Sequence, residues 1–78
     1  MGWVEKNDKL VKTFEMESFS DIINRLNALA EVANEMNHHP DFEVFGYKQI
    51  KFSLSTHDSN SITDNDHQLA KEIDAVFE

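Results

Sequence analysis

The chain has 78 residues, of which 40% are hydrophobic and 28% charged, a composition typical of a folded domain rather than a wholly disordered chain. Fifteen acidic residues against seven basic ones give a formal net charge of −8, which repels phosphate backbones and anionic lipids, so we expect no nucleic-acid partner and no membrane. The lack of cysteine excludes disulfides and thiolate metal sites.

The length and the lack of targeting signals set the expected organisation and location. Residues 1–78 form one predicted domain, and a domain of this size buries only about 60% of the surface of its unfolded chain, so we expect it to associate with further copies of itself. No stretch approaches the roughly 20 apolar residues of a transmembrane helix. The first residues also lack the basic and apolar regions of a signal peptide, so we expect a cytoplasmic protein.

A β-hairpin is predicted at the start of the chain, from strands over residues 3–6 and 9–14. Asn7 and Asp8, between them, are typical turn residues. In the second strand the side chains alternate between a polar face and a mostly apolar one, so one side of the sheet should be covered. The mostly apolar face consists of Leu10, Lys12, Phe14 and Met16.

The clearest helix is predicted to begin after Ser18. The hydroxyl of Ser18 can cap the first free backbone amides, and Asp21, three residues later, can complete a capping box. This helix cannot run past His39, because Pro40 lacks an amide and disfavours helical geometry in the residue before it. Its apolar stripe recurs at spacings of three and four and consists of Phe19, Ile22, Ile23, Leu26, Leu29, Ala30, Ala33 and Met36.

Two further strands and a second helix complete the pattern. Residues 42–45 form the third predicted strand, Gly46 permits a turn, and residues 47–56 form the fourth, in which apolar and polar side chains alternate. Thr63 and Asp66 repeat the capping-box pattern before a second amphipathic helix. The apolar stripe of that helix consists of Leu69, Ala70, Ile73, Val76 and Phe77.

The predicted element order is β-β-α-β-β-α. It favours an α+β fold in two layers, with a four-stranded antiparallel sheet and both helices packed on one face, because that arrangement buries both apolar stripes at once. The same order is two copies of a β-β-α unit, although the sequence shows no convincing repeat.

Three of the four histidines lie between residues 34 and 66. His38 and His39 can be simple caps that interact with the last carbonyls of the helix, His57 can be an ordinary polar residue at a strand end, and His67 is expected to be solvated. A metal site of the first three is a further interpretation. Sequence neighbours rarely chelate one ion well, and no carboxylate at the spacing of a known metal motif accompanies them, so we expect no metal.

The spacing of these residues resembles a known signature. Asn37-His38-His39-Pro40 is followed by Tyr47 seven residues after the proline, by His57 ten residues later and by Asp66 nine residues after that. This spaced set resembles the signature of the pterin-4a-carbinolamine dehydratases. Four further stretches resemble the same family, so that the resemblance covers nearly the whole chain: Gly2-Trp3, Phe14 to Phe19, Leu54-Ser55-Thr56-His57 and Leu69-Ala70.

The resemblance implies a β-β-α-β-β-α fold with an antiparallel sheet and an enzyme of the hydro-lyase class. Members of the family remove water from a 4a-hydroxytetrahydropterin, such as 4a-hydroxytetrahydrobiopterin, and produce quinonoid dihydropterin. They thereby recycle a pterin cofactor after aromatic amino-acid hydroxylation. The pterin is the substrate, so the resemblance implies no bound cofactor. It also implies a homodimer or a homotetramer.

By the same resemblance the catalytic residues are His38, His39 and His57; His38 and His57 would exchange protons, and His39 would help hold the pterin. Histidine suits proton exchange because its unperturbed pKa lies near neutrality. Asn34 stands where the signature has an acidic or other charged residue, so we expect His38 to be tuned differently than beside a carboxylate. The resemblance also implies that Asn37, Ser55, Thr56 and Asp58 line the pterin site and that Asn34, Tyr47 and Asp66 support it.

Two other functions stay open. The family includes a dimerisation cofactor of a homeodomain transcription factor, which implies a noncatalytic protein-binding module as one alternative. Related pterin chemistry linked to molybdopterin is the other. Turnover of a 4a-hydroxytetrahydropterin would separate catalysis from binding.

Overall fold

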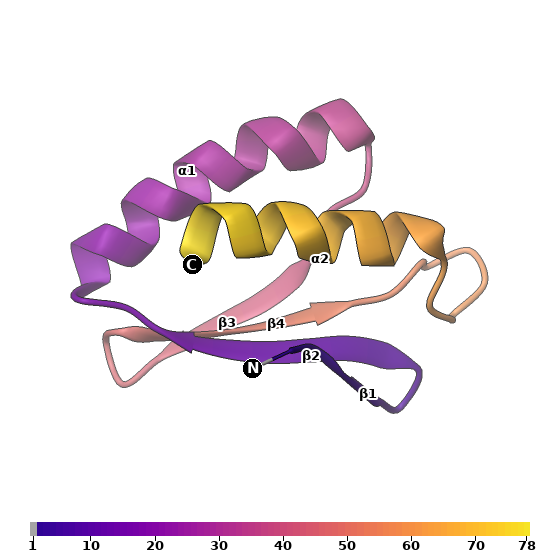
Figure 1. Ribbon diagram of the computed structural model, residues 1–78, viewed down its shortest axis with the longest axis horizontal. Coiled ribbons are helices and arrows are strands. Elements are labelled where there is room, and N and C mark those ends of the chain that lie inside the picture. Colours follow the sequence, from indigo (N-terminus) through magenta and orange to yellow (C-terminus); the bar gives the residue numbers. More distant parts are fainter. Residues whose placement is uncertain (1) are drawn as a thin grey trace.

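Within residues 2–78, six elements follow one another in the order that the sequence predicts (Figure 1). The computed structural model describes residues 2–78. Neither helix among these residues has the length and apolar character needed to cross a membrane. The elements are β1 (Val4–Lys6), β2 (Lys9–Glu15), α1 (Phe19–Met36), β3 (Asp41–Phe45), β4 (Gln49–Leu54) and α2 (Asp64–Phe77).

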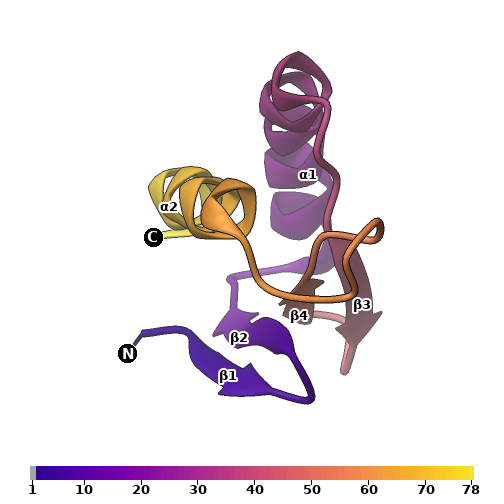
Figure 2. The same cartoon turned by 90° about the vertical axis from the view of Figure 1, so that its right-hand side faces the viewer.

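The four strands form one antiparallel sheet in the order β1-β2-β4-β3. The central pair of β2 and β4 therefore joins the two halves of the chain. Figure 2 shows both helices on the same side of the sheet, with α2 above β1 and β2 and with α1 above β4 and β3. The predicted two-layer α+β fold is confirmed, and β1 and β3 are the two edges of the sheet.

The core lies between the sheet and the helices and follows the predicted alternation. On β4 the side chains of Ile50, Phe52 and Leu54 are buried. The ring centroid of Phe52 lies 5.1 Å from that of Phe77 on α2 and 6.0 Å from that of Phe14 on β2, so this ring ties the sheet to the second helix. The other buried apolar side chains are Leu10, Ile22, Leu29, Ala33, Leu69, Ala70 and Ile73.

Ser18 caps α1 as predicted, and its hydroxyl accepts a hydrogen bond from the amide of Asp21 at 3.0 Å. In the described part of the chain, the return bond from the amide of Ser18 to the carboxylate of Asp21 does not form. The carboxylate of Asp21 instead accepts a hydrogen bond from Nε of Arg25, 2.9 Å away and one helical turn later. The predicted box at this helix is therefore wrong in its second half, because the acidic side chain pairs with Arg25 instead.

The helix α1 ends at Met36, earlier than the following proline alone requires, because Asn37 adopts a left-handed conformation with φ of 53°. The amide of Asn37 donates to the carbonyl of Asn34 at 3.2 Å. The amide of His38 donates to the carbonyl of Ala33 at 3.1 Å. These bonds form a Schellman motif, in which asparagine is the usual alternative to glycine. The turn sends the chain from the end of α1 down to β3 (Figure 2).

The turn between β3 and β4 corrects the predicted fourth strand. Gly46 and Tyr47 have left-handed φ angles of 55° and 54°, a combination typical of tight hairpin turns. The strand β4 therefore begins at Gln49 and not at Tyr47, and it ends at Leu54 and not at Thr56. Tyr47 thus lies in a turn, where the sequence had placed it in a strand.

Candidate active site

Asp66 lies where three parts of the chain meet. It is in the first turn of α2, and its side chain is fully buried. One carboxylate oxygen, Oδ1, accepts a hydrogen bond from Nε2 of His38, 2.6 Å away, in the segment after α1. The other oxygen, Oδ2, accepts a hydrogen bond from the hydroxyl of Thr56, 2.9 Å away, after β4. The carboxylate therefore joins the two segments that the sequence predicts to share one site.

The local sequence explains why Asp66 is held in this position. Thr63 is the N-cap of α2, and the predicted capping box is confirmed, with the amide of Thr63 donating to Oδ2 of Asp66 at 2.9 Å. The hydroxyl of Thr63 lies 2.6 Å from that of Thr56 and 3.4 Å from the same Oδ2. Because the box uses Oδ2, Oδ1 is left for a partner from elsewhere in the fold.

Burial and hydrogen bonding shift the pKa of Asp66 in opposite directions. Burial raises the pKa, since an ionised carboxylate loses its hydration. The hydrogen bonds from His38, from the amide of Thr63 and from the hydroxyl of Thr56 favour the ionised form and outweigh burial. The pKa of Asp66 therefore lies below its ordinary value of 3.8. At neutral pH the residue is a carboxylate that accepts hydrogen bonds on both oxygens.

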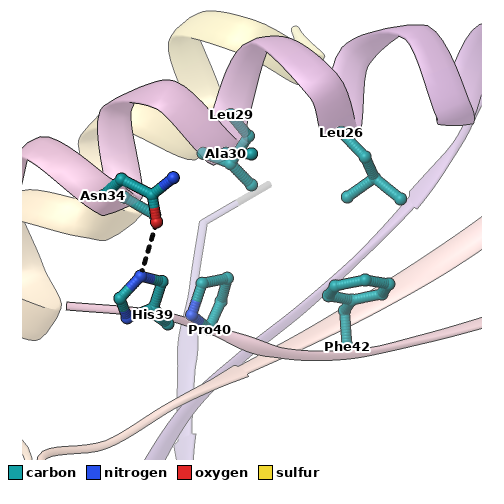
Figure 3. Close-up of a pocket in the computed structure, with 8 residues that line it drawn as sticks. Leu26, Leu29, Ala30, Asn34, His39, Pro40 and Phe42 are labelled. Carbon is teal, nitrogen blue, oxygen red and sulfur yellow. Dashed lines mark hydrogen bonds between the residues drawn. The ribbon is translucent and has the colours of Figure 1, made fainter. Parts of the chain in front are cut away.

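The two adjacent histidines point to different partners. The side chain of His38 is 12% exposed and reaches Asp66. His39 is exposed, and its Nε2 lies 2.8 Å from Oδ1 of Asn34 on α1 (Figure 3). Asn37, also exposed, forms the turn that separates both histidines from α1. Within residues 2–78 neither imidazole contacts a carbonyl of the helix end, so the cap interpretation is wrong for both side chains.

Asn34 therefore contacts His39 and not His38. The sequence predicts that this position tunes His38, but the carboxylate beside that imidazole comes from Asp66 on the other helix. The prediction placed the asparagine beside the wrong imidazole, because spacing along α1 does not show the direction that the chain takes after the left-handed Asn37.

Residues 55–58, which follow β4, supply the second part of the candidate site. The backbone of Thr56 pairs with that of Ser61 and closes the loop between these two residues. Ser55 is half-buried, and His57 and Asp58 are exposed. Within residues 2–78 no hydrogen bond engages these three side chains, whereas the hydroxyl of Thr56 is already hydrogen-bonded. The three unengaged side chains can therefore face a ligand.

Tyr47 lies apart from these residues. It occupies the turn between β3 and β4 and is 66% exposed, whereas residues 55–58 follow the opposite end of β4. A strand of this length spans about 20 Å. Among the described residues of one chain, Tyr47 makes no contact with the other predicted site residues that would support the role predicted for it.

The histidines of the predicted site do not form a metal centre in the described part of the chain. Among residues 2–78 no three His, Cys, Asp or Glu side chains are grouped as ligands. Nε2 of His38 and Nε2 of His39 are each within hydrogen-bond distance of a carboxylate or amide oxygen.

An apolar groove opens beside His39, between α1 and β3 (Figure 3). Its volume is about 280 Å³, and Asn34 and His39 form its polar end. Phe42 of β3 lies opposite Leu26 of α1 (Figure 3) and is 51% exposed, so the groove leaves apolar surface uncovered. The other lining residues are Leu29, Ala30, Ala33 and Pro40.

Thr63 is the residue that sequence reasoning left out of the site. The sequence predicts it only as a helix cap, but its hydroxyl also contacts the hydroxyl of Thr56 and the carboxylate of Asp66. A signal was available, because the acidic member of the capping box is also the last residue of the spaced signature. A residue with both roles places the cap beside the site.

Comparison with known sequences identifies the family. The family model described as Pterin 4 alpha carbinolamine dehydratase matches residues 1–76. A protein of Sulfurisphaera tokodaii assigned as a pterin-4-alpha-carbinolamine dehydratase is 42% identical over 76 residues, which cover 97% of this chain and 81% of the relative. A protein of Aquifex aeolicus with the same assignment is 40% identical over 75 residues, which cover 96% of this chain and 75% of the relative.

Solved structures share the fold. A protein of Brucella melitensis described as a transcriptional coactivator/pterin dehydratase superposes with a TM-score of 0.92 at 24% identity, over 99% of this chain and 83% of the other. A pterin dehydratase-like protein identified as a RuBisCO assembly factor in the alpha-carboxysome has a TM-score of 0.78 at 25% identity, over 97% of this chain and 89% of the other. Sequence and fold agree over almost the whole chain, which therefore belongs to the pterin-4-alpha-carbinolamine dehydratase family of hydro-lyases.

Proposed function

We propose that this protein removes water from a 4a-hydroxytetrahydropterin, such as 4a-hydroxytetrahydrobiopterin, and produces quinonoid dihydropterin. The C4a–O bond breaks, and the leaving hydroxide takes up a proton and departs as water. Nitrogen N5 loses its proton as the double bond between C4a and N5 forms. Oxidation states do not change overall, so the chemistry itself requires no redox cofactor. The reaction would recycle a pterin cofactor after aromatic amino-acid hydroxylation in the cytoplasm.

One observation carries this proposal: the imidazole of His38 lies 2.6 Å from a buried carboxylate while its side chain stays partly open to solvent. Imidazoles exchange protons near neutral pH, and a positioned acid or base contributes about 10²–10⁴-fold in rate. The dehydration removes one proton and supplies another. His38 and His57 are the proposed pair for these two transfers.

The remaining polar side chains suit recognition of a pterin, whose ring edge carries several hydrogen-bond donors and acceptors. Asn37 and Asp58 are exposed and Ser55 is half-buried. His39 presents an exposed ring that can help hold the pterin. The hydroxyl of Thr56 already contacts Asp66, so in this proposal it fixes the carboxylate rather than binding the ligand.

A homodimer is the proposed basic unit. The strand β3 is an edge of the sheet, and such an edge presents unpaired backbone groups. Phe42 and Phe45 on this strand are 51% and 39% exposed, and Phe42 also lines the apolar groove. A second copy of the chain over this edge would bury these surfaces. Light scattering at micromolar concentration should give at least twice the mass of one chain, and a monomer mass would contradict this part of the proposal.

A noncatalytic protein-binding role is the second candidate. Two solved structures of the same fold are described as a coactivator and as an assembly factor. In this chain Phe19 and Ile23 on α1 and Phe42 on β3 are exposed apolar side chains that a partner can cover. These side chains are not part of the contact between His38 and Asp66, so binding and catalysis can be tested separately.

Turnover of a 4a-hydroxytetrahydropterin tests the main proposal. We expect the purified protein to accelerate formation of the quinonoid product, with an initial rate proportional to enzyme concentration after the rate in buffer is subtracted. The product is followed by its absorbance. A rate equal to that in buffer, from a protein shown to be folded, would contradict the enzymatic proposal and favour the binding role.

A further inference from the structure

We infer that His38 exchanges its proton through Nδ1, and that Asp66 is the positioning residue that makes Nδ1 the reacting nitrogen. This inference rests on the proposed dehydration and assigns an atom and a second residue to it. It follows from the different surroundings of the two ring nitrogens.

The Nε2 side of the ring is closed. Nε2 lies 2.6 Å from Oδ1 of Asp66, and the Asp66 side chain is fully buried. A carboxylate can only accept hydrogen bonds, so Nε2 must carry the hydrogen. A neutral His38 then has its lone pair on Nδ1, because neutral imidazole carries one ring hydrogen.

The Nδ1 side of the ring is open. Among residues 2–78 no protein atom forms a hydrogen bond with Nδ1 of His38. In the same part of the chain no fully buried side-chain nitrogen or oxygen lacks a hydrogen-bond partner. Nδ1 must therefore reach solvent, and some of the 12% exposure of this side chain lies at that nitrogen. A substrate can therefore form a hydrogen bond with the imidazole at this nitrogen.

The direction of the ring is fixed by contacts behind the carboxylate. Oδ2 of Asp66 accepts hydrogen bonds from the amide of Thr63 and the hydroxyl of Thr56, both at 2.9 Å. Rotation of the carboxylate away from His38 would break both bonds. The N-terminal cap of α2 thus sets which nitrogen of an imidazole 28 residues away faces outward.

This arrangement suits the base in the dehydration. Nδ1 takes the proton from N5 of the pterin, and the electron pair of that bond forms the double bond to C4a. The hydroxide that leaves C4a takes its proton from a second group, for which His57 is the proposed donor. The imidazolium formed at His38 faces the Asp66 carboxylate, which stabilises its positive charge. Nδ1 then returns the proton to water.

Asp66→Asn is the sharpest variant, because the carboxamide cannot satisfy both sides. The amide of Thr63 and Nε2–H of His38 each need an acceptor, and asparagine offers one oxygen and one NH₂ group. If the oxygen keeps the helix cap, the NH₂ group faces His38 and favours the tautomer with its hydrogen on Nδ1. That tautomer has no lone pair on the open side.

Nitrogen NMR of labelled protein distinguishes the two tautomers of neutral His38 without any turnover. We expect the wild-type protein to carry the hydrogen on Nε2 and Asp66→Asn to shift toward Nδ1–H, with a fall in kcat of at least about ten-fold. Ser18→Ala is the matched control, because it removes the hydroxyl cap of α1 at 3.0 Å and touches no site residue. It should lower the melting temperature and leave the His38 tautomer and kcat unchanged.

A wild-type His38 with its hydrogen on Nδ1 would overturn the inference, even if Asp66→Asn fails to fold. An Asp66→Asn protein with unchanged tautomer and kcat would overturn it as well. A folded wild-type protein that shows Nε2–H and no dehydration would overturn the proposed function instead, and would leave the assignment of the open nitrogen supported. The two failures are therefore distinguishable.

Discussion

A buried charged side chain lies at each end of α2, and the surroundings of the two charges differ. At the N-terminal end the carboxylate of Asp66 is fully buried and has an imidazole as one partner. At the C-terminal end the ammonium of Lys12, from β2, donates to Asp74 at 2.9 Å and to Glu78. It also lies 4.7 Å from the ring centroid of Phe14, within the range of a cation–π contact.

The two clusters differ in whether a proton can leave them. Burial lowers the pKa of Lys12, but its hydrogen bonds to Glu78 and Asp74 outweigh burial and raise the pKa above 10.5, so the ammonium keeps its proton at neutral pH. Asp66 is equally fixed as a carboxylate, yet its partner is an imidazole with one open nitrogen. A buried charge is therefore no sign of catalysis by itself. The distinguishing feature is a titratable partner that a substrate can reach.

Removal of the His38 imidazole should have the largest effect on turnover. A small effect would contradict the difference drawn between the two ends of α2. We expect His38→Ala to fold and to lose turnover by about 100-fold or more, because a positioned acid or base contributes about 10²–10⁴-fold. His67→Ala is the matched control, since this exposed histidine on α2 lies next to Asp66 in sequence, and it should keep wild-type turnover. Melting temperature and kcat should be measured on both. A His38→Ala protein with most of its turnover would return His38 to a structural role.

The second cluster should affect stability alone. Lys12→Met keeps an aliphatic chain over Phe14 and loses the hydrogen bonds to Asp74 and Glu78, whose side chains are 33% and 51% exposed. Hydrogen bonds to charged groups contribute about 1.5–3 kcal/mol, and exposure of the partners reduces this, so we expect a loss of about 1–2 kcal/mol. Urea unfolding measures the loss. A fall in kcat of the folded variant would contradict the separation of the two clusters.

The two clusters should also lose their contributions to stability at opposite ends of the pH scale. Folding lowers the pKa of Asp66, so its contribution to stability is present above the unfolded pKa of about 3.9 and is lost as pH falls through the lower folded value. Folding raises the pKa of Lys12, so its contribution is present below 10.5 and is lost as pH rises through the higher folded value. When the melting temperature is plotted against pH, Asp66→Asn should flatten the acid side of the curve and Lys12→Met should flatten the alkaline side. The reverse pattern would contradict both assignments.

The parts of the fold that were predictable from sequence depend on local patterns. The alternation in β4 predicted the buried positions of Ile50, Phe52 and Leu54. Ser18 and Thr63 predicted the start of each helix, because capping involves residues only three positions apart. The element order and the covered face of the sheet followed from these patterns, since each apolar stripe must be buried.

The parts that were missed depend on single backbone angles or on distant contacts. Left-handed Asn37 ends α1, and left-handed Tyr47 shortens β4, although each residue type is also compatible with the longer element. The capping box predicted where Oδ2 of Asp66 lies, but the partner of Oδ1 is 28 residues away and depends on how α2 packs beside the end of α1. The contact between Asn34 and His39 was missed because it depends on the direction that the chain takes after left-handed Asn37.

The smallest expected effect comes from Asn34→Ala, which tests the difference between the two adjacent histidines. The exposed contact between Asn34 and Nε2 of His39 is 2.8 Å long, and an exposed hydrogen bond contributes about 1 kcal/mol or less. If His39 holds the pterin, its loosened ring should raise KM by a few-fold, since about 1.4 kcal/mol corresponds to ten-fold, and should leave kcat unchanged. His39→Ala, which removes the ring, should raise KM further in the same direction. Steady-state kinetics give both constants, and a fall in kcat for Asn34→Ala as large as that for His38→Ala would move the proton transfer from His38 to its neighbour.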